Sequence, residues 1–373
     1  MNETLKTILA EAMHLGREGR FTEATALIQR GLHLTQPLPE QRESHPSAGD
    51  PDRRPVVEAD FEVIEDIGRT GGRSIHGHFT HGIETRDYRV YVPAGADDRP
   101  RPLILMLHGC QQDAEDFARL TRFDPLADEL GFIVLYPTQP RTANATGCWN
   151  WFLPEHRRAD QGEAAWLIAL TQAIATRYQA DPHHIHVAGL SAGGAMALTL
   201  AATQPALFRS VGVHSGLPHG LAQDQLSALT LMHQGPTAVS GGRTAMDGIG
   251  VPVIVFQGDA DLRVNPANAS GIIEQALSGA PEARSGLDAS GVERETGRAP
   301  GGLGYTRTRY LAADGSSRAE LWMVQGGGHA WFGGDPAASF AEPRGPDASR
   351  EMVRFFLERS VPDARATGTD RSG

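Results

Sequence analysis

The segment Val187–Gly194, with the sequence VAGLSAGG, decides the expected fold of this chain. An apolar run ends at Gly189, and small and apolar residues typical of a buried helix follow from Ala192. Between them, the pattern G-x-S-x-G around Ser191 is typical of a sharp turn from a strand into a helix, which lifts the serine hydroxyl above the sheet. Glycine is expected on both sides because a Cβ there would strike the neighbouring strand or helix.

Apolar runs on both sides of this segment predict strands that alternate with helices, and therefore an α/β fold with a mainly parallel central sheet and helices on both faces. The predicted parallel strands are 103–107, 132–136, 185–188, 211–213, 251–256 and 320–324. Residues 61–67 and 74–92 alternate between apolar and polar, which predicts antiparallel strands leading into the sheet. Helices are expected at 114–130, 162–178 and 349–357, and loop-rich insertions at 216–248 and 278–302.

The pattern divides the chain into four parts. Apolar residues at helical spacing predict an N-terminal helical hairpin at 1–34, which would pack on its own domain or form a homodimer. A proline-rich and charged stretch predicts a linker at 35–57. The catalytic domain is expected at 58–360, and a disordered tail at 361–373.

Composition excludes several classes of protein. The formal net charge of −11 argues against a nucleic-acid partner, because phosphate contacts require a basic surface. No apolar run approaches the roughly 20 residues of a membrane span. The first twenty residues carry several charges and no apolar core of a secretory signal, so we expect a cytoplasmic protein.

A serine hydroxyl is a weak nucleophile until a base takes its proton and a carboxylate orients that base. In α/β-hydrolases the order along the chain is Ser, then Asp or Glu, then His. Asp259 and Asp261 both follow the strand at 251–256, and either could be the carboxylate. Of the fifteen histidines, His329 lies on a glycine-rich loop after a late strand, and we predict that it is the base.

The negative oxygen of the tetrahedral intermediate needs two hydrogen-bond donors. We predict the backbone N–H of Ala192, directly after the nucleophile, and that of Cys110, in the loop after the strand at 103–107. His108 is expected to hold this loop by hydrogen bonding. Cys110 is a weaker candidate nucleophile than Ser191, and a bridge from Cys110 to Cys148 stays open, although a reducing compartment disfavours it.

Aromatic residues make up 6% of the chain, yet several gather beside the predicted site. Flat apolar walls suit an acyl chain or a polymer segment. We therefore predict substrate contacts from Trp149, Asn150, Trp151 and Trp331. Trp166, within a helix, is expected in the core. The histidines at 183–186 show no carboxylate or cysteine partner in the sequence, so we expect no metal.

Four motifs together resemble the poly(3-hydroxybutyrate) depolymerase-type esterases, a family that also contains feruloyl and acetylxylan esterases. The motifs are LHGC at 107–110, GCWNWF at 147–152, GLSAGGAM at 189–196 and GHAW at 328–331. The resemblance covers roughly residues 80–357 and implies an α/β-hydrolase fold without a cofactor. It also favours Asp261 over Asp259, because Gly-x-x-Asp-x-x-Val is the usual form of this loop in α/β-hydrolases, and so implies a triad of Ser191, Asp261 and His329.

Three hypotheses follow. The first is a serine carboxylesterase that hydrolyses poly(3-hydroxybutyrate) or its oligomers through an acyl-enzyme intermediate. The second keeps this chemistry but acts on feruloyl or acetyl esters of plant polysaccharides. The third, from another class, is a protein that binds polyhydroxybutyrate granules or a partner through the helical hairpin, with an inert hydrolase body.

Overall fold

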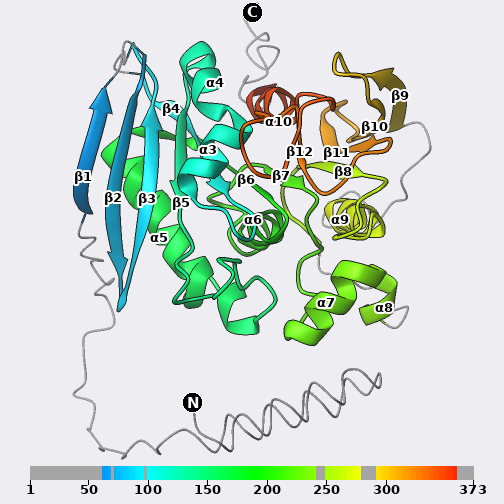
Figure 1. Cartoon of the computed structure of the whole chain (residues 1–373), viewed down its shortest axis with the longest axis horizontal. Helices are drawn as coiled ribbons and strands as arrows, with labels where there is room; N and C mark the ends of the chain where they lie inside the picture. The colour runs from blue at the N-terminus through cyan, green and yellow to red at the C-terminus, as the bar shows by residue number, and fades with distance from the viewer. Residues whose placement is uncertain (1–60, 69–70, 96–98, 241–247, 279–290, 359–373) are drawn as a thin grey trace, which may run out of the picture. The chain divides into compact units, whose positions relative to one another are not determined.

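A mixed sheet of eleven strands lies at the centre of the described part of the chain (Figure 1). The structure, a computed structural model, describes residues 61–68, 71–95, 99–240, 248–278 and 291–358. These residues belong to one unit, Val57–Gly373. The predicted hairpin, linker and tail lie outside the described residues.

The strands follow one another along the chain as β1 (Phe61–Gly68), β2 (Arg73–His81), β3 (Glu84–Val92), β4 (Arg101–Leu107), β5 (Ile133–Pro137), β6 (Ala180–Leu190), β7 (Val211–His214), β8 (Val253–Gly258), β9 (Val292–Arg298), β10 (Gly304–Leu311) and β11 (Ser317–Val324). Across the sheet their order is β1-β2-β3-β5-β4-β6-β7-β8-β11-β10-β9. Two short strands, β12 (Trp331–Phe332) and β13 (Ala341–Glu342), form a second sheet.

The middle of the large sheet is parallel. Strands β5, β4, β6, β7, β8 and β11 pair in parallel, whereas β1, β2 and β3 on one flank and β9 and β10 on the other pair antiparallel. All residues from Leu103 to Leu107 in β4 are fully buried. A strand covered on both faces requires such a continuous apolar run, so the predicted parallel centre is confirmed.

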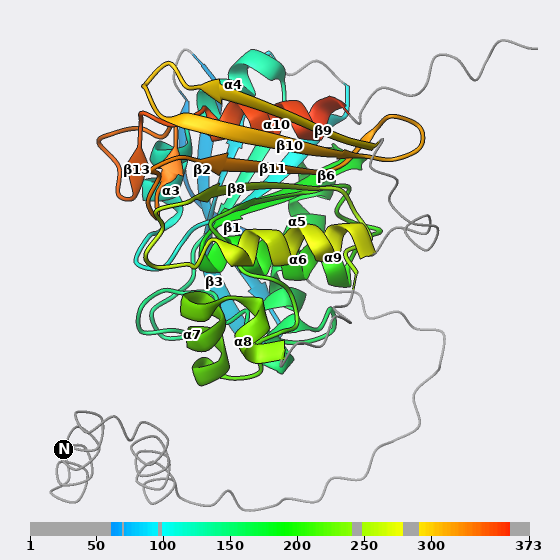
Figure 2. The same ribbon diagram turned by 90° about the vertical axis from the view of Figure 1, so that its right-hand side faces the viewer.

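Helices cover both faces of this sheet (Figure 2). The helices are α3 (Ala114–Thr121), α4 (Phe123–Leu130), α5 (Gly162–Arg177), α6 (Ala192–Thr203), α7 (Gln225–Gln234), α8 (Pro236–Ser240), α9 (Ala267–Ser278) and α10 (Ala348–Leu357), with a 3-10 turn at Pro154–Arg157. One core holds buried residues of α5, α6 and α9, including Trp166 as predicted, and the other holds residues of α3, α4 and α10. Within the described ranges, none of the helices combines the length and apolarity that crossing a bilayer requires.

Three expectations about secondary structure are wrong. The predicted helix at 114–130 is broken in two at Arg122, which has a left-handed φ of 55°. The predicted loop at 216–248 contains α7 and α8, and the predicted loop at 278–302 contains β9. Six of the seven residues of β9 are exposed, because it is an edge strand, so it lacks the apolar alternation by which strands are found in a sequence.

Candidate active site

Ser191 lies in a strained turn between β6 and α6. Its backbone has φ 56° and ψ −118°, outside the regions that residues with a side chain normally adopt. A Cβ on Gly189 would lie 2.4 Å from the carbonyl carbon of Gly193, and one on Gly193 would lie 2.1 Å from the backbone oxygen of Leu107. The two glycines therefore let α6 pass close to β4 and β6, as the pattern G-x-S-x-G predicts.

Asp261 and His329 meet although 68 residues separate them. Asp261 follows β8 and His329 follows β11, and these two strands are parallel neighbours. Nδ1 of His329 lies 2.8 Å from Oδ2 of Asp261. An ionised carboxylate accepts only, so this contact places the imidazole proton on Nδ1 and leaves a lone pair on Nε2.

The Asp261 carboxylate is fully enclosed and held by several donors. Its Oδ1 accepts hydrogen bonds from the backbone N–H groups of Arg263 and Val264, at 2.8 and 2.9 Å, and its Oδ2 accepts one from Gln257 at 3.1 Å. Burial raises the pKa of Asp261. The hydrogen bond from His329, the charge of His329 and the two backbone donors lower it by more, so the pKa of Asp261 lies below its ordinary value. The carboxylate is therefore ionised beside the imidazole.

Asp259 is a turn residue. Its Oδ1 accepts a hydrogen bond of 2.7 Å from the backbone N–H of Gly326, and it contacts neither Ser191 nor His329 in the described hydrogen bonds. The bond ties the loop after β8 to the loop that carries His329. Of the two candidate carboxylates, the structure brings Asp261 to the imidazole.

Ser191 and His329 line one cavity of about 670 Å³, which opens at the carboxyl ends of the parallel strands. Among the described residues, the Ser191 hydroxyl has no hydrogen-bond partner, so the structure places the serine and the imidazole on a common wall without a bond between them. Such bonds are often long without a substrate and tighten when one binds.

Two backbone N–H groups at this wall are unpaired in the described part of the chain. They belong to Ala192, the first residue of α6, and to Cys110, in the loop after β4, and both residues line the cavity. His108 holds this loop from behind, because its Nε2 accepts a hydrogen bond of 3.0 Å from the backbone N–H of Gln139. The structural role predicted for His108 is confirmed.

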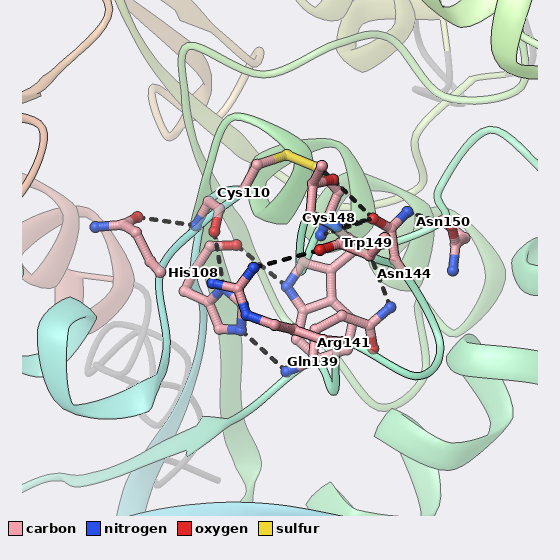
Figure 3. The surroundings of a disulfide bond; sticks show 12 residues. His108, Cys110, Gln139, Arg141, Asn144, Cys148, Trp149 and Asn150 are labelled. Carbon is pink, nitrogen blue, oxygen red and sulfur yellow. Dashed lines mark hydrogen bonds between the residues drawn. A yellow bond between two sulfur atoms is a disulfide. The ribbon is translucent and has the colours of Figure 1, made fainter.

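Cys110 and Cys148 form a disulfide, and their sulfurs are joined at the rim of the cavity (Figure 3). The bridge answers the question that the sequence left open, and it removes the free thiol that an alternative nucleophile at Cys110 would need. It also connects the loop after β4 to the loop at 144–152, which supplies a second wall of the cavity.

Of the four residues predicted to contact the substrate, Trp151 lies on the cavity wall, whereas Trp149, Asn150 and Trp331 are buried behind it. Trp151 lines the cavity. Trp149 is fully buried and donates from Nε1 to the backbone oxygen of His108 at 3.1 Å (Figure 3). Asn150 is buried against Glu163, which it contacts through both its backbone N–H and its side-chain amide at 2.7 Å. These two residues support the cavity wall from behind.

Trp331 also lies in the core. It is fully buried, and its Nε1 donates to Oγ of Ser349 at 2.9 Å. Its position next to His329 in the sequence suggested a place at the cavity, but β12 turns the ring to the opposite side, where it packs on Phe117 and Phe123.

Residues of α7 form a wall that the sequence did not predict. Ala228, Leu229 and Met232 line the cavity, together with Leu217 and Leu262 from neighbouring loops. Leu231, on the same helix, is buried and does not line the cavity. The apolar residues of α7 therefore do not lie on a single face, and the helix lacks a clear amphipathic pattern. The apolar character of this wall depends on the placement of α7 over the carboxyl edge.

His214, at the end of β7, is a further residue that sequence reasoning missed. Its backbone oxygen accepts from the N–H of Ser191 at 2.9 Å, and its Nε2 accepts from the N–H of Phe332 at 3.1 Å. Burial, reinforced by the nearby His329, lowers the pKa of His214 to about 3, against the opposing charge of Asp261. His214 thus links the turn at Ser191, through its backbone oxygen, to the loop that carries His329, through its neutral ring.

The expectation that the histidines at 183–186 lack a carboxylate partner is wrong for His184. His184 pairs with Asp181 at 2.6 Å, and Nδ1 of His186 lies 2.8 Å from Oγ of Ser210. Among the residues that the structure describes, no group of three His, Cys, Asp or Glu side chains is placed to hold a metal ion.

Comparison with known sequences places the chain among esterases. The family model described as esterase PHB depolymerase matches residues 86–299. Poly(3-hydroxyalkanoate) depolymerase C of Paucimonas lemoignei is 30% identical over 247 residues, which cover 64% of this chain and 57% of that protein. Feruloyl esterase B of Thermothelomyces thermophilus is 31% identical over 140 residues, which cover 37% of this chain and 47% of that protein. The chain thus spans about half the length of these curated relatives.

Among solved structures, an acetyl xylan esterase from Aspergillus awamori is similar in fold. Its TM-score is 0.51 at 21% sequence identity, and the match covers 65% of this chain and 88% of that chain. This likeness supports the fold, and with the sheet described above it confirms the predicted α/β-hydrolase architecture. Because the family model matches more than half of its length, the chain belongs to the esterase PHB depolymerase family.

Proposed function

We propose that the protein is a carboxylic ester hydrolase that uses Ser191 as its nucleophile. The observation that carries this proposal is the 2.8 Å contact of Asp261 with His329 on the wall of the cavity that Ser191 also lines. Asp261 orients the imidazole so that its Nε2 lone pair is available as a general base. The strained turn exposes the serine hydroxyl to the same cavity.

In the first half of the reaction, Oγ of Ser191 attacks the ester carbonyl carbon while Nε2 of His329 takes the hydroxyl proton. The carbonyl oxygen becomes negative and accepts hydrogen bonds from the N–H groups of Ala192 and Cys110. When the tetrahedral intermediate collapses, the bond to the alcohol oxygen breaks and the alcohol leaves with the proton from His329. Ser191 is then esterified by the acyl group.

In the second half, water replaces the alcohol. His329 takes a proton from the water as its oxygen attacks the acyl carbon, and the same two N–H groups hold the negative oxygen. Collapse breaks the bond to Oγ of Ser191, which regains a proton from His329. The products are a carboxylic acid and the free enzyme, so the cycle consumes one water for each ester.

For the substrate we propose esters of 3-hydroxybutyrate, as polymer or oligomer. The family match and the poly(3-hydroxyalkanoate) depolymerase among the relatives support this choice. The apolar walls from Trp151, Phe152 and α7 suit an aliphatic polyester. Feruloyl or acetyl esters of plant polysaccharides are the second candidate, because a feruloyl esterase is also among the relatives.

The test compares hydrolysis of hydroxybutyrate oligomers, methyl ferulate, acetylated xylan and p-nitrophenyl butyrate by the wild type and three variants. Ser191→Ala and Asp261→Asn are expected to lower kcat on every substrate by roughly 10³-fold or more. Asp259→Asn, the matched control, removes the charge, keeps an oxygen that can accept the turn hydrogen bond from Gly326, and should retain most of kcat. Undiminished turnover by folded Ser191→Ala would reject the mechanism, and a higher kcat/KM on methyl ferulate or acetylated xylan than on the oligomers would reject the substrate.

A further inference from the structure

The cavity wall carries positive charge although the whole chain has a formal net charge of −11. Among the described residues that line the cavity, the ionisable side chains are Arg263, His233 and His329, and no aspartate or glutamate is present. An arginine stays protonated at every pH at which proteins are folded. A polyester without ionised groups offers no negative partner for this charge, so the arginine indicates a negatively charged group on the substrate.

Arg263 is placed at the cavity by the same loop that supplies the Asp261 carboxylate. Its backbone N–H donates to Oδ1 of Asp261 at 2.8 Å. This hydrogen bond holds the backbone of Arg263 next to the Asp261 carboxylate. Leu262, between them, is 92% exposed, so the loop lies at the open side of the cavity. A ligand that enters the cavity therefore passes the guanidinium.

An aromatic ring supports the Arg263 guanidinium. The guanidinium carbon lies 5.4 Å from the ring centroid of Phe340, which also lines the cavity. Phe340 has a left-handed φ of 57°, unusual for a residue with a bulky side chain, and its backbone oxygen accepts from the N–H of Trp331 at 2.7 Å. Strained residues of this kind persist where the surroundings hold them, so Phe340 offers a fixed face for the arginine.

In the described part of the chain, Arg263 has no acidic partner, whereas three other arginines do. Arg307 and Arg354 pair with the buried Glu320, and Arg89 pairs with Asp124. Within the described ranges, the Arg263 side chain forms neither an ion pair nor a hydrogen bond. A guanidinium that contacts an aromatic face keeps its N–H groups available, and these match the two oxygens of a carboxylate.

We propose that Arg263 binds the free carboxylate at the end of a hydroxyacid oligoester while an ester group of the same molecule lies at Ser191. This subsite rests on the proposed ester hydrolase function and adds a substrate class to it, namely short chains that end in a carboxylate. A cavity of about 670 Å³ falls in the range that encloses drug-sized ligands, so one short oligomer can contact both residues.

The test measures binding separately from hydrolysis. In the full-length Ser191→Ala protein, titration calorimetry gives the Kd of the 3-hydroxybutyrate trimer as the free acid and as its methyl ester, which lacks the charge. We expect the acid to bind more tightly. Adding Arg263→Gln should weaken binding of the acid by about fivefold, the size of an ion pair near a surface, and leave the methyl ester much less affected. Arg263→Lys, which retains the charge, should retain part of the preference for the free acid over the methyl ester.

The matched control is Arg209→Gln. Arg209 is also exposed, but it precedes β7 and lies at the opposite edge of the sheet from the cavity, so its loss changes the net charge equally without changing the subsite. The inference is overturned if acid and methyl ester bind equally, if neither binds, or if Arg263→Gln weakens both to the same extent. Loss of the ester hydrolase function would appear separately, as absent turnover of p-nitrophenyl butyrate by the wild type.

Discussion

At the scale of single residues, His214 shows how a buried side chain can organise a site without touching the cavity. Its backbone oxygen holds the N–H of Ser191 and its ring nitrogen holds the N–H of Phe332, three residues after His329. The ring also stacks on Trp331, with centroids 4.9 Å apart. The contact with Phe332 requires a neutral imidazole, because a protonated Nε2 cannot accept a hydrogen bond.

This arrangement predicts an acid-sensitive fold. The pKa of His214 is about 3 in the folded state and near 6.5 in the unfolded chain, so below about pH 6 the unfolded chain binds the extra proton. The contribution of His214 to stability is complete above pH 6.5 and decreases as the pH falls toward 3, by about 1.4 kcal/mol per pH unit. We therefore measure the free energy of unfolding by denaturant titration at several pH values between 7 and 4. Plotted against pH, it should change less steeply for His214→Gln than for the wild type. His183→Gln, an exposed control, should keep the wild-type slope, and equal slopes for His214→Gln and the wild type would refute the assignment.

At the scale of elements, the disulfide joins the loop after β4 to the loop at 144–152, and together they form one wall of the cavity. This wall has one side that faces the cavity and one that faces the core. Trp151 and the bridge face the cavity, while Trp149 and Asn150 anchor the wall to His108 and Glu163. Two tryptophans separated by one residue in the same loop thus have different surroundings. The cause is the local path of the chain, which buries one ring and leaves the other at the cavity.

The same substitution at these two tryptophans should separate the functions. Trp149→Phe removes the donor to the backbone oxygen of His108, so the free energy of unfolding should fall by about 1–3 kcal/mol, whereas KM should stay near the wild-type value. Trp151→Phe reduces an apolar wall and should raise KM for p-nitrophenyl butyrate by roughly twofold to fivefold, with a smaller effect on stability. Chemical denaturation and steady-state kinetics measure both effects. The reverse pattern would show that Trp149, and not Trp151, contacts the substrate.

At the scale of the whole molecule, the described sheet and the candidate site lie between Phe61 and Glu358. All of the proposed catalytic residues lie beyond residue 109, and both hydrophobic cores consist of residues from 75 onward. We propose that the predicted helical hairpin at 1–34 mediates contact with a second copy of the chain or with a polyhydroxybutyrate granule.

A chain that starts at residue 58 should fold and hydrolyse p-nitrophenyl butyrate with kcat/KM close to that of the full chain, because it keeps every described residue of the two cores and of the cavity wall. Light scattering and co-sedimentation with polyhydroxybutyrate granules should show a loss of dimer or of granule binding. If the shortened chain unfolds or loses turnover, the hairpin is part of the catalytic unit. If neither association changes, the proposed contact is wrong.

Much of the fold was predictable, because the decisive patterns are local. The parallel strands are continuous apolar runs, and the turn at Ser191 needs glycines within two residues of it. The candidate carboxylate and base were also identifiable, since each follows a strand and the carboxyl ends of parallel strands meet at one edge. By contrast, β9 has almost no apolar residue to mark it, and α7 has apolar residues on more than one side.

The sequence by itself determined the class of fold, the family and the short list of reactive side chains, because each depends on residues close together in the chain. The tertiary structure decided which aromatic rings face the cavity, that Cys110 meets Cys148, and that His214 connects two loops of the site. It also placed Arg263, whose side chain has no acidic partner among the described residues, on the wall of the cavity that His329 lines. These features depend on contacts between segments tens of residues apart, and burial of a side chain is a property of the packed molecule, which no local pattern contains.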